Sequence, residues 1–448
     1  MSYFETRERA LLGNDYEVLY ESDTAVYRGI TVNTLRCAPA DFSVLHAFDC
    51  APSSFCDTAF VLQNPQEKPG LSPYHHAGVF YVQEPSASIA ATLLGVQPGD
   101  TVLDLCAAPG GKTSQLAAAL QGEGLLVANE YMSARATILK NNLERMGVTN
   151  AVVLNEDTAR IAKALPAYFN RVLVDAPCSG EGMFRKEPQA VTQHCEGLVL
   201  QCAALGAQIL DNAAACLAPG GTLVYSTCTF APQEDEMQIG AFLARHPEFE
   251  LLPIEISVGS EGEVKRAGEY DYPVHYTRRI YPCHGGEGHF MAKLHKKGQT
   301  VSTLQKPPKT KPMPTECENF LKTYFPSLLG KNTQLIGDSV YLLPNTPLPP
   351  LAKLHCLQAG VLAGAMVKNR FVPAHNLFMA YGAQCTNVEH LTQKDDRTAA
   401  WLRGEEIEAQ TAQQGYCAVL CDGFPLGFGK QSGEKVKNHY PKGLRNLK

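Results

Sequence analysis

The sequence lacks the features that would place the chain in a membrane or export it. It has no run of about 18 consecutive apolar residues, the length that a membrane-spanning helix needs. Its first residues, MSYFETRERALLGNDYEVLY, include acidic side chains from the start and no apolar stretch typical of a signal peptide. We therefore expect a soluble, cytoplasmic protein without a membrane partner.

Paired cysteine motifs are also missing, although the chain contains 15 cysteines. No two of them form a CxxC pair, and the clustered Cys and His residues typical of zinc sites are absent from the sequence. A disulfide framework is unusual in a chain of this length. We expect reduced thiols, most of them small core residues, and no bound metal.

The chain carries little excess charge. Its formal net charge of −6 does not suggest a nucleic-acid partner, so any such partner must be held by local basic patches. The 448 residues predict roughly two to four domains. Hydrophobic residues make up 45% of the chain, which is enough for cores of ordinary size.

Apolar runs of strand length alternate with helical segments from about residue 100 onward. The expected strands are Thr101–Cys106, Leu125–Glu130, Ala151–Leu154, Arg171–Ala176 and Thr222–Cys228. The expected helices are Thr113–Leu120, Ser133–Met146, Thr158–Leu165 and Leu198–Leu217. This alternation predicts βαβ units around a parallel sheet, and hence an α/β, Rossmann-like core at 96–295.

Composition changes mark the other parts of the chain. Residues 1–95 mix short apolar runs with turn signals, and we expect a mixed α/β N-terminal extension. Residues 296–315 combine lysines with prolines and are typical of an extended linker. Residues 316–448 form a C-terminal region whose end, 424–448, has six basic residues against one acidic residue, with aromatics interleaved.

The segment VLDLCAAPGGKT (102–113) predicts a ligand site. A buried strand runs into a Pro-Gly-Gly turn before a helix begins, and Gly110 and Gly111 let a ligand approach the main chain closely. Glu130 ends the second strand, where a carboxylate can accept hydrogen bonds from ribose hydroxyls. Asp157 follows the third strand and is placed to border an adenine. Neither GxGxxG nor GxxxxGK[ST] is present in this segment, which disfavours NAD and nucleoside triphosphates and favours S-adenosylmethionine.

Two cysteines follow the fourth and fifth strands, in LVDAPCSGEG (173–182) and LVYSTCTF (223–230). If these strands are neighbours, Cys178 and Cys228 face one cavity beside the cofactor. A thiolate that adds to carbon 6 of cytosine makes carbon 5 able to accept a methyl group. Asp175 is placed to stabilise charge on the ring from its N3 side. A helix that starts near Pro232 would help to activate Cys228.

With these residues, the chain resembles the RNA (cytosine-5)-methyltransferases of the NOL/NOP/SUN type, and within them the bacterial 16S ribosomal-RNA methyltransferase F group. The likeness spans nearly the whole chain, and the region from 316 to about 400 matches less clearly. The matching stretches are GVFYVQEPSAS (78–88), LDLCAAPGGKTSQLA (103–117), LVDAPCSGEGMFRK (173–186), LVYSTCTFAPQEDE (223–236), HGGEGHFMAKL (284–294) and GFGKQSGEKVKNHYPKGLR (427–445).

The resemblance implies a Rossmann-like S-adenosylmethionine-dependent methyltransferase core and a C-terminal RNA-binding region with a basic PUA-like end. It implies that Cys228 is the nucleophile and that Cys178 aids product release, roles that the sequence alone does not assign. Asp175 would lie against the target cytosine. The residues expected to contact S-adenosylmethionine are Cys106, Ala107, Ala108, Pro109, Gly110, Gly111, Lys112, Glu130, Asp157 and Asp175.

The target base must be single-stranded or flipped out, so the chain needs RNA contacts beyond the catalytic residues. Basic and aromatic side chains suit this task. The candidates are Arg185, Lys186, Lys437, His439, Tyr440, Lys442 and Arg445. We expect a monomer that acts on 16S ribosomal RNA or the small ribosomal subunit. The alternatives are a tRNA cytosine-5 methyltransferase, an inactive RNA-binding relative, or a Rossmann enzyme acting on a small molecule.

Overall fold

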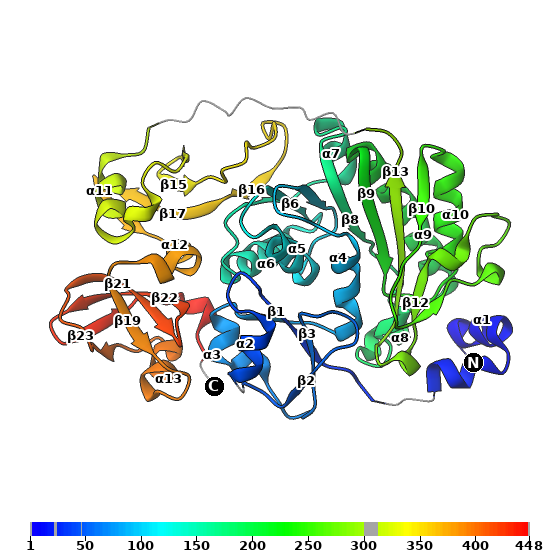
Figure 1. Ribbon diagram of the computed structural model, residues 1–448, viewed down its shortest axis with the longest axis horizontal. Coiled ribbons are helices and arrows are strands. Elements are labelled where there is room, and N and C mark those ends of the chain that lie inside the picture. The colour runs from blue at the N-terminus through cyan, green and yellow to red at the C-terminus, as the bar shows by residue number, and fades with distance from the viewer. Residues whose placement is uncertain (1, 22–24, 46, 300–311, 447–448) are drawn as a thin grey trace.

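The computed structural model describes residues 2–21, 25–45, 47–299 and 312–446 (Figure 1). The expected linker at 296–315 falls mostly on residues 300–311, which lie outside the described residues. On either side of this gap, a strand ends at Lys296 and a helix begins at Thr315.

The N-terminal part is mixed α/β, as predicted. An antiparallel sheet has the strand order β2-β3-β1-β4, and Phe42 of α2 and Tyr74 of α3 pack against it. The elements are α1 (Tyr3–Leu12), β1 (Gly29–Val32), α2 (Pro39–Val44), β2 (Cys50–Pro52), β3 (Ala59–Leu62), α3 (Pro73–His76), β4 (Phe80–Val82) and α4 (Ile89–Leu93).

The central part confirms the predicted alternation of strands and helices. Its first elements are β5 (Thr101–Asp104), α5 (Gly111–Leu120), β6 (Leu125–Asn129), α6 (Ser133–Arg145), β7 (Ala151–Leu154), α7 (Thr158–Ala164) and β8 (Phe169–Asp175). They are followed by α8 (Pro188–Gln193), α9 (Glu196–Cys216), β9 (Leu217–Thr227), α10 (Glu236–Arg245), β10 (Phe249–Leu252), β11 (Ser260–Glu261), β12 (Arg278–Ile280) and β13 (His289–Lys296).

These strands form one large sheet in the order β11-β12-β13-β9-β8-β5-β6-β7-β16, and β10 also pairs with β13. The run β9-β8-β5-β6-β7 is parallel, while β13 pairs with β9 in the antiparallel direction. The chain winds outward in both directions from β5. The carboxyl ends of β5, β6, β7, β8 and β9 therefore share one edge, where open sheets of this kind bind ligands.

The parallel strands read as continuous apolar runs because both faces of the sheet are covered. Leu103 and Val172 pack into a core on one face, with residues of α7 and α9. Val102 and Leu173 pack into the core of the other face, with residues of α4, α5 and α6. This two-sided burial makes the sheet a rigid platform for the residues at its edge.

The C-terminal part contains two further sheets, one with the order β14-β15-β17-β18 and one with the order β19-β21-β22-β23-β20. The first group of elements is α11 (Thr315–Tyr324), β14 (Thr333–Ile336), β15 (Ser339–Leu342), β16 (Cys356–Ala359), β17 (Val361–Val367), β18 (Arg370–Pro373) and α12 (His375–Tyr381). The second is β19 (Val388–Leu391), α13 (Asp396–Arg403), β20 (Ile407–Glu408), β21 (Gly415–Cys421), β22 (Phe424–Ser432) and β23 (Lys435–Asn438).

The C-terminal part contacts the rest of the chain at several places, among them α12 against α6. Strand β16 extends the large sheet by pairing with β7 in the antiparallel direction. The second C-terminal sheet lies beside the N-terminal part (Figure 1). Residues of both, such as Phe42 and Trp401, share one core.

Among the described residues, one helix, α9, is long and apolar enough to cross a membrane by length and composition alone. Two of its residues, Leu210 and Ala213, are fully buried in the core that covers one face of the large sheet. A core helix of a folded domain passes the same test, so this helix is weak evidence for a membrane span.

Candidate active site

The loop after β5 forms one wall of a cavity of about 200 Å³. Gly110 has a φ of +114°, a left-handed conformation that glycine adopts without strain, and α5 begins at the next residue. The cavity is lined by Tyr81, Val82, Gln83, Ala87, Asp104, Cys106, Ala107, Ala108, Pro109, Gly111, Lys112 and Asp175. Most of the residues expected to hold the cofactor thus surround one cavity.

The other expected cofactor residues lie at the ends of neighbouring strands. The buried Glu130 follows β6 and accepts a hydrogen bond from Met132 N at 2.8 Å. Asp157 follows β7 and caps α7 by accepting a hydrogen bond from Ala159 N at 2.8 Å. The buried Asn129 donates to the carbonyl oxygens of Leu105 and Glu156, and so ties these strand ends together. Asn129 is not among the residues predicted from the sequence, and its position at the end of an apolar strand is the signal that could have indicated it.

Asp175 lies at the end of β8 between two donors. Its Oδ2 accepts from Lys112 Nζ at 2.7 Å and its Oδ1 accepts from Ser226 Oγ at 2.7 Å. Burial alone would raise the pKa of Asp175, but the Lys112 ammonium and the two hydrogen bonds outweigh it and hold the pKa below its usual value. Asp175 is therefore ionised, and the proton donor of this pair is Lys112.

Cys178 and Cys228 meet beside this ion pair. Their Sγ atoms lie 3.2 Å apart, and Cys228 N donates to Cys178 Sγ at 3.4 Å. The contact exists because β8 and β9 are parallel neighbours, with Asp175 opposite Ser226. The hydrogen bond with Cys228 and burial raise the pKa of Cys178 well above that of a free thiol. Cys178 therefore keeps its proton, which it can share with Cys228.

Buried polar side chains hold the turns that carry the two cysteines. Glu234 accepts from Ser179 Oγ at 2.5 Å and from Ser179 N at 2.9 Å. Burial raises the pKa of Glu234 to about 7, although the hydrogen bonds from Ser179 oppose this. Asp235 accepts from Thr227 Oγ1 at 2.6 Å, and the fully buried Arg279 pairs with Asp235 at 2.9 Å.

The expected helix near Pro232 begins at Glu236 with Asp235 as its N-cap, so the first turn of α10 is acidic and paired with Arg279. Arg279 also donates to the carbonyl oxygen of Phe230 at 3.3 Å. The residues around the start of α10 therefore act as a buried ionic support for the turn that follows Cys228.

The motifs at 78–88 and 284–294 meet at the other side of the site. Ser86 Oγ donates to Glu84 Oε2 at 2.6 Å and contacts His289 Nδ1 at 3.0 Å. Glu287 is buried and pairs with Arg185 at 3.3 Å and with Lys186 at 3.6 Å. These two candidate RNA-binding residues thus lie beside the cysteine loop, with part of their charge neutralised by Glu287.

The remaining candidate RNA-binding residues lie in the C-terminal part. Lys437, Lys442 and His439 are exposed, and the His439 ring stacks on Phe428 with the ring centroids 5.0 Å apart. Tyr440 differs from the expectation, because it is only 2% exposed and its hydroxyl lies 2.8 Å from His76 Nδ1. A ring packed in the core between two parts of the chain has no free face for stacking on a base.

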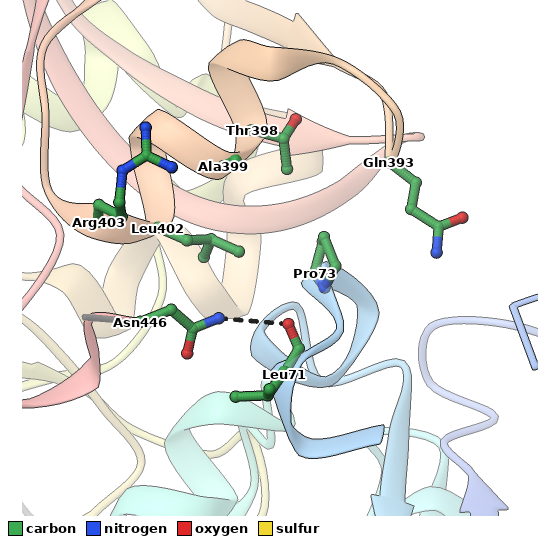
Figure 2. Close-up of a pocket in the computed structure, with 8 residues that line it drawn as sticks. All are labelled: Leu71, Pro73, Gln393, Thr398, Ala399, Leu402, Arg403 and Asn446. Carbon is green, nitrogen blue, oxygen red and sulfur yellow. Dashed lines mark hydrogen bonds between the residues drawn. The ribbon is translucent and has the colours of Figure 1, made fainter. Parts of the chain in front are cut away.

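Arg445 also turns inward and donates to the Tyr440 carbonyl at 3.3 Å. A second cavity of about 310 Å³ lies near this point, between the start of α3 and α13 (Figure 2). Figure 2 shows Asn446, one of the lining residues, donating to the Leu71 carbonyl oxygen. Neither cysteine lines it, and it is separate from the site described above.

Comparison with known families matches four consecutive stretches of the chain. The profile for 16S rRNA methyltransferase RsmB/F matches residues 91–295, and the profile for the N-terminal domain of 16S rRNA methyltransferase RsmF matches residues 2–85. The profile for the first C-terminal domain of RsmF rRNA methyltransferase matches residues 319–381, and the methyltransferase RsmF PUA domain matches residues 389–446. The chain is an S-adenosylmethionine-dependent RNA methyltransferase with a Rossmann-like core.

Individual relatives identify the family within this class of RNA methyltransferases. The chain is 31% identical over 439 residues to ribosomal RNA small subunit methyltransferase F of Klebsiella pneumoniae, covering 93% of this chain and 90% of that protein. It is 32% identical over 444 residues to the protein of the same name from Aeromonas salmonicida, covering 93% and 90%. The chain belongs to the ribosomal RNA small subunit methyltransferase F family.

Solved structures agree with this fold. A methyltransferase homolog protein from Pyrococcus horikoshii has a TM-score of 0.56 at 27% identity, covering 66% of this chain and 100% of that chain. The NSun6 protein of the same organism, crystallised with SFG, has a TM-score of 0.56 at 19% identity, covering 66% and 97%. This second likeness supports the fold alone.

Proposed function

We propose that the chain methylates carbon 5 of a cytosine in 16S ribosomal RNA through a covalent bond between Cys228 and carbon 6 of the base. The contact between Cys178 and Cys228 Sγ at 3.2 Å, next to the Lys112–Asp175 ion pair, is the observation that carries this proposal. A nucleophile, a proton-bearing partner and a charged pair in one place match the needs of covalent catalysis on a pyrimidine ring.

The residues around the 200 Å³ cavity fit S-adenosylmethionine, which supplies a methyl group activated by its positive sulfur. Glu130 would hold the ribose hydroxyls and Asp157 would border the adenine. Asp104 is buried and its Oδ1 has no hydrogen-bond partner among the described residues, so this oxygen is available to the ammonium group of the methionine part. The loop from Cys106 to Lys112 would supply the backbone groups.

Four side chains of the protein have separate roles in the reaction on the base. Cys228 Sγ attacks carbon 6 and Cys178 keeps the proton that the departing Cys228 later needs. The ionised Asp175 accepts a hydrogen bond from the amino group of cytosine. The Lys112 ammonium then stabilises negative charge that develops on the ring, because it is held in place before the reaction starts.

The RNA would approach from the side of Arg185 and Lys186, with further contacts from Lys437, His439 and Lys442 in the C-terminal part. The relatives' names support 16S ribosomal RNA as the substrate, and a tRNA substrate is the alternative outcome. We further propose that the protein acts in the cytoplasm as a monomer.

Single cysteine variants test the mechanism. Cys228→Ala should abolish methyl transfer, and Cys178→Ala should accumulate a covalent protein–RNA adduct that survives denaturing electrophoresis. Cys195→Ala is the matched control, because Cys195 is exposed at the start of α9 and should leave turnover unchanged. Full activity of Cys228→Ala would refute the assignment of the nucleophile.

The substrate needs a separate experiment. Mapping of 5-methylcytosine in RNA from cells with and without the gene should show loss of a site in 16S ribosomal RNA. Loss of a tRNA site with intact ribosomal RNA would contradict the proposed substrate but not the proposed chemistry.

A further inference from the structure

The motifs at 78–88 and 284–294 contact each other through Ser86 and His289. The mechanism above assigns no role to His289. His289 is the first residue of β13 and is 5% exposed. Strand β13 pairs with β9 so that Met291 lies opposite Ser226 and Phe290 opposite Thr227. Continuing this register by one residue places His289 opposite Cys228, on the sheet face of Ser226.

A close backbone approach supports this placement. Gly182 N donates to the Cys228 carbonyl at 2.9 Å. A Cβ atom at Gly182 would stand 2.8 Å from the Gly288 carbonyl oxygen and 3.0 Å from the Cys228 carbonyl oxygen. The residue that precedes His289 and the backbone of Cys228 therefore flank the same glycine.

The hydrogen bonds around His289 decide which ring nitrogen carries its proton. Glu84 accepts from Ser86 Oγ at 2.6 Å, and also from the backbone N–H groups of Ser86, Ala87 and Glu287. The single proton of the Ser86 hydroxyl is thus committed to Glu84, and Ser86 Oγ must accept from His289 Nδ1. His289 Nε2 is then left with a free lone pair, and no partner for it is found in the part of the chain that the structure describes.

Burial and the Lys112 ammonium keep this imidazole neutral. Together they lower the pKa of His289 to about 4, although the charges of Glu84 and Asp175 oppose the shift. The ring is therefore unprotonated at Nε2 near neutral pH, and its lone pair is present there before the reaction starts.

We propose that His289 Nε2 is the base that removes the carbon 5 proton after methyl transfer. This inference rests on the proposed function. A ring held between a nucleophile and a methyl donor receives them on opposite faces, so the carbon 5 hydrogen ends on the face of the Cys228 sulfur. The strand register places His289 opposite Cys228, whereas the Cys178 thiol already holds a proton.

The step balances without any further reactant. Nε2 takes the proton from carbon 5, and the C5–H electron pair becomes the C5=C6 double bond. The C6–S bond breaks and its electron pair leaves on Cys228, which takes the proton that it shares with Cys178. Glu84 and Ser86 are positioning residues, because they act only by fixing the tautomer and orientation of His289.

His289→Gln is the main test, in single turnovers with RNA that carries deuterium at carbon 5 of cytosine. Formation of the methylated adduct should keep its wild-type rate. Its resolution should slow by about 10²- to 10⁴-fold, the usual contribution of a general base, and should show a primary isotope effect. His295→Gln, on the same strand, is the matched control with wild-type kinetics expected.

Ser86→Ala is the second variant, in case His289→Gln does not fold. It should slow resolution by a smaller factor with S-adenosylmethionine affinity unchanged. Normal resolution in both variants, or slower adduct formation instead, would overturn the inference. An isotope effect that appears in Cys178→Ala but not in His289→Gln would assign the base to Cys178 and also overturn it. Absence of any adduct in both the wild type and Cys178→Ala would instead refute the proposed function.

Discussion

Replacing Lys112 with methionine tests whether the cation beside Asp175 takes part in methyl transfer. The Nζ–Oδ2 distance of 2.7 Å corresponds to an attraction of about 6 kcal/mol at an effective dielectric constant of about 20, before the cost of burial is subtracted. Methionine keeps the length of the side chain and removes the charge. Without the ammonium, the pKa of Asp175 should rise, because burial would then be opposed only by the Ser226 hydrogen bond and by weaker, more distant charges.

The expected loss of activity follows from the same geometry. Loss of one preorganised donor costs about 10²- to 10³-fold in rate, or roughly 3–4 kcal/mol of transition-state stabilisation. The methyl-transfer rate of Lys112→Met should fall by that factor in single turnovers with saturating RNA and S-adenosylmethionine. The rate should recover partly at high pH, because the fraction of ionised Asp175 grows as the pH rises through its increased pKa.

A matched control separates this effect from a general loss of charge. Lys140 pairs with Glu144 at 3.3 Å on α6, where both side chains are partly buried, and an ion pair between residues i and i+4 of a helix contributes less than about 1 kcal/mol. Lys140→Met should therefore leave the methyl-transfer rate unchanged. A Lys112→Met variant with the wild-type rate would refute the reasoning, and an equal loss in both variants would attribute it to the net charge of the protein.

Three further predictions concern stability and cofactor binding. Arg279→Met should lower the free energy of unfolding by about 3–5 kcal/mol in chemical denaturation, because it leaves the buried carboxylates of Asp235 and Glu236 without their ion pair. Arg245→Met, at an exposed ion pair, should lower it by less than about 1 kcal/mol. Equal effects of the two variants would contradict the prediction. Burial raises the pKa of Asp104 from 3.8 to about 7, so the native state holds a proton that the unfolded chain releases, and stability should fall by up to about 4 kcal/mol as the pH rises from 4 to 7. Asp104→Asn should reduce the decline measured in thermal denaturation series, with the raised pKa of Glu234 causing the remainder, and an unchanged decline would rule Asp104 out as a source. Glu130→Gln should weaken S-adenosylmethionine binding roughly 10-fold or more in calorimetry, and an unchanged affinity would exclude a ribose contact.

The sequence predicted the parallel core well, because both faces of its strands are buried and this leaves a continuous apolar signal. It also predicted the meeting of Cys178 and Cys228, since strands four and five of such sheets are usually neighbours. It did not predict that Lys112 pairs with Asp175. These residues are far apart in the chain, and a lysine in a glycine-rich loop is equally typical of a residue that contacts a ligand.

Other contacts had no local signal at all. The hydrogen bond between His76 and Tyr440 joins opposite ends of the chain. The burial of Tyr440 therefore depends on packing between domains, and the basic residues around it in the sequence did not indicate it. The Glu84–Ser86–His289 chain likewise links two motifs about 200 residues apart. The sequence motifs alone did not indicate these contacts, because the contacts depend on the strand register that brings the two motifs together.

Strand β16 has a practical consequence for anyone who dissects this enzyme. Truncating the chain after residue 299 would remove β16, the strand that pairs with β7. The backbone N–H and C=O groups on that side of β7 would then be unpaired at an exposed sheet edge. The hydrogen bond from His355 N to the buried Glu156 would vanish with it, beside the end of the strand that carries Asp157. A catalytic fragment trimmed to its sequence-family borders should therefore self-associate and bind its methyl donor less well, and protein engineers should keep β16 with the core.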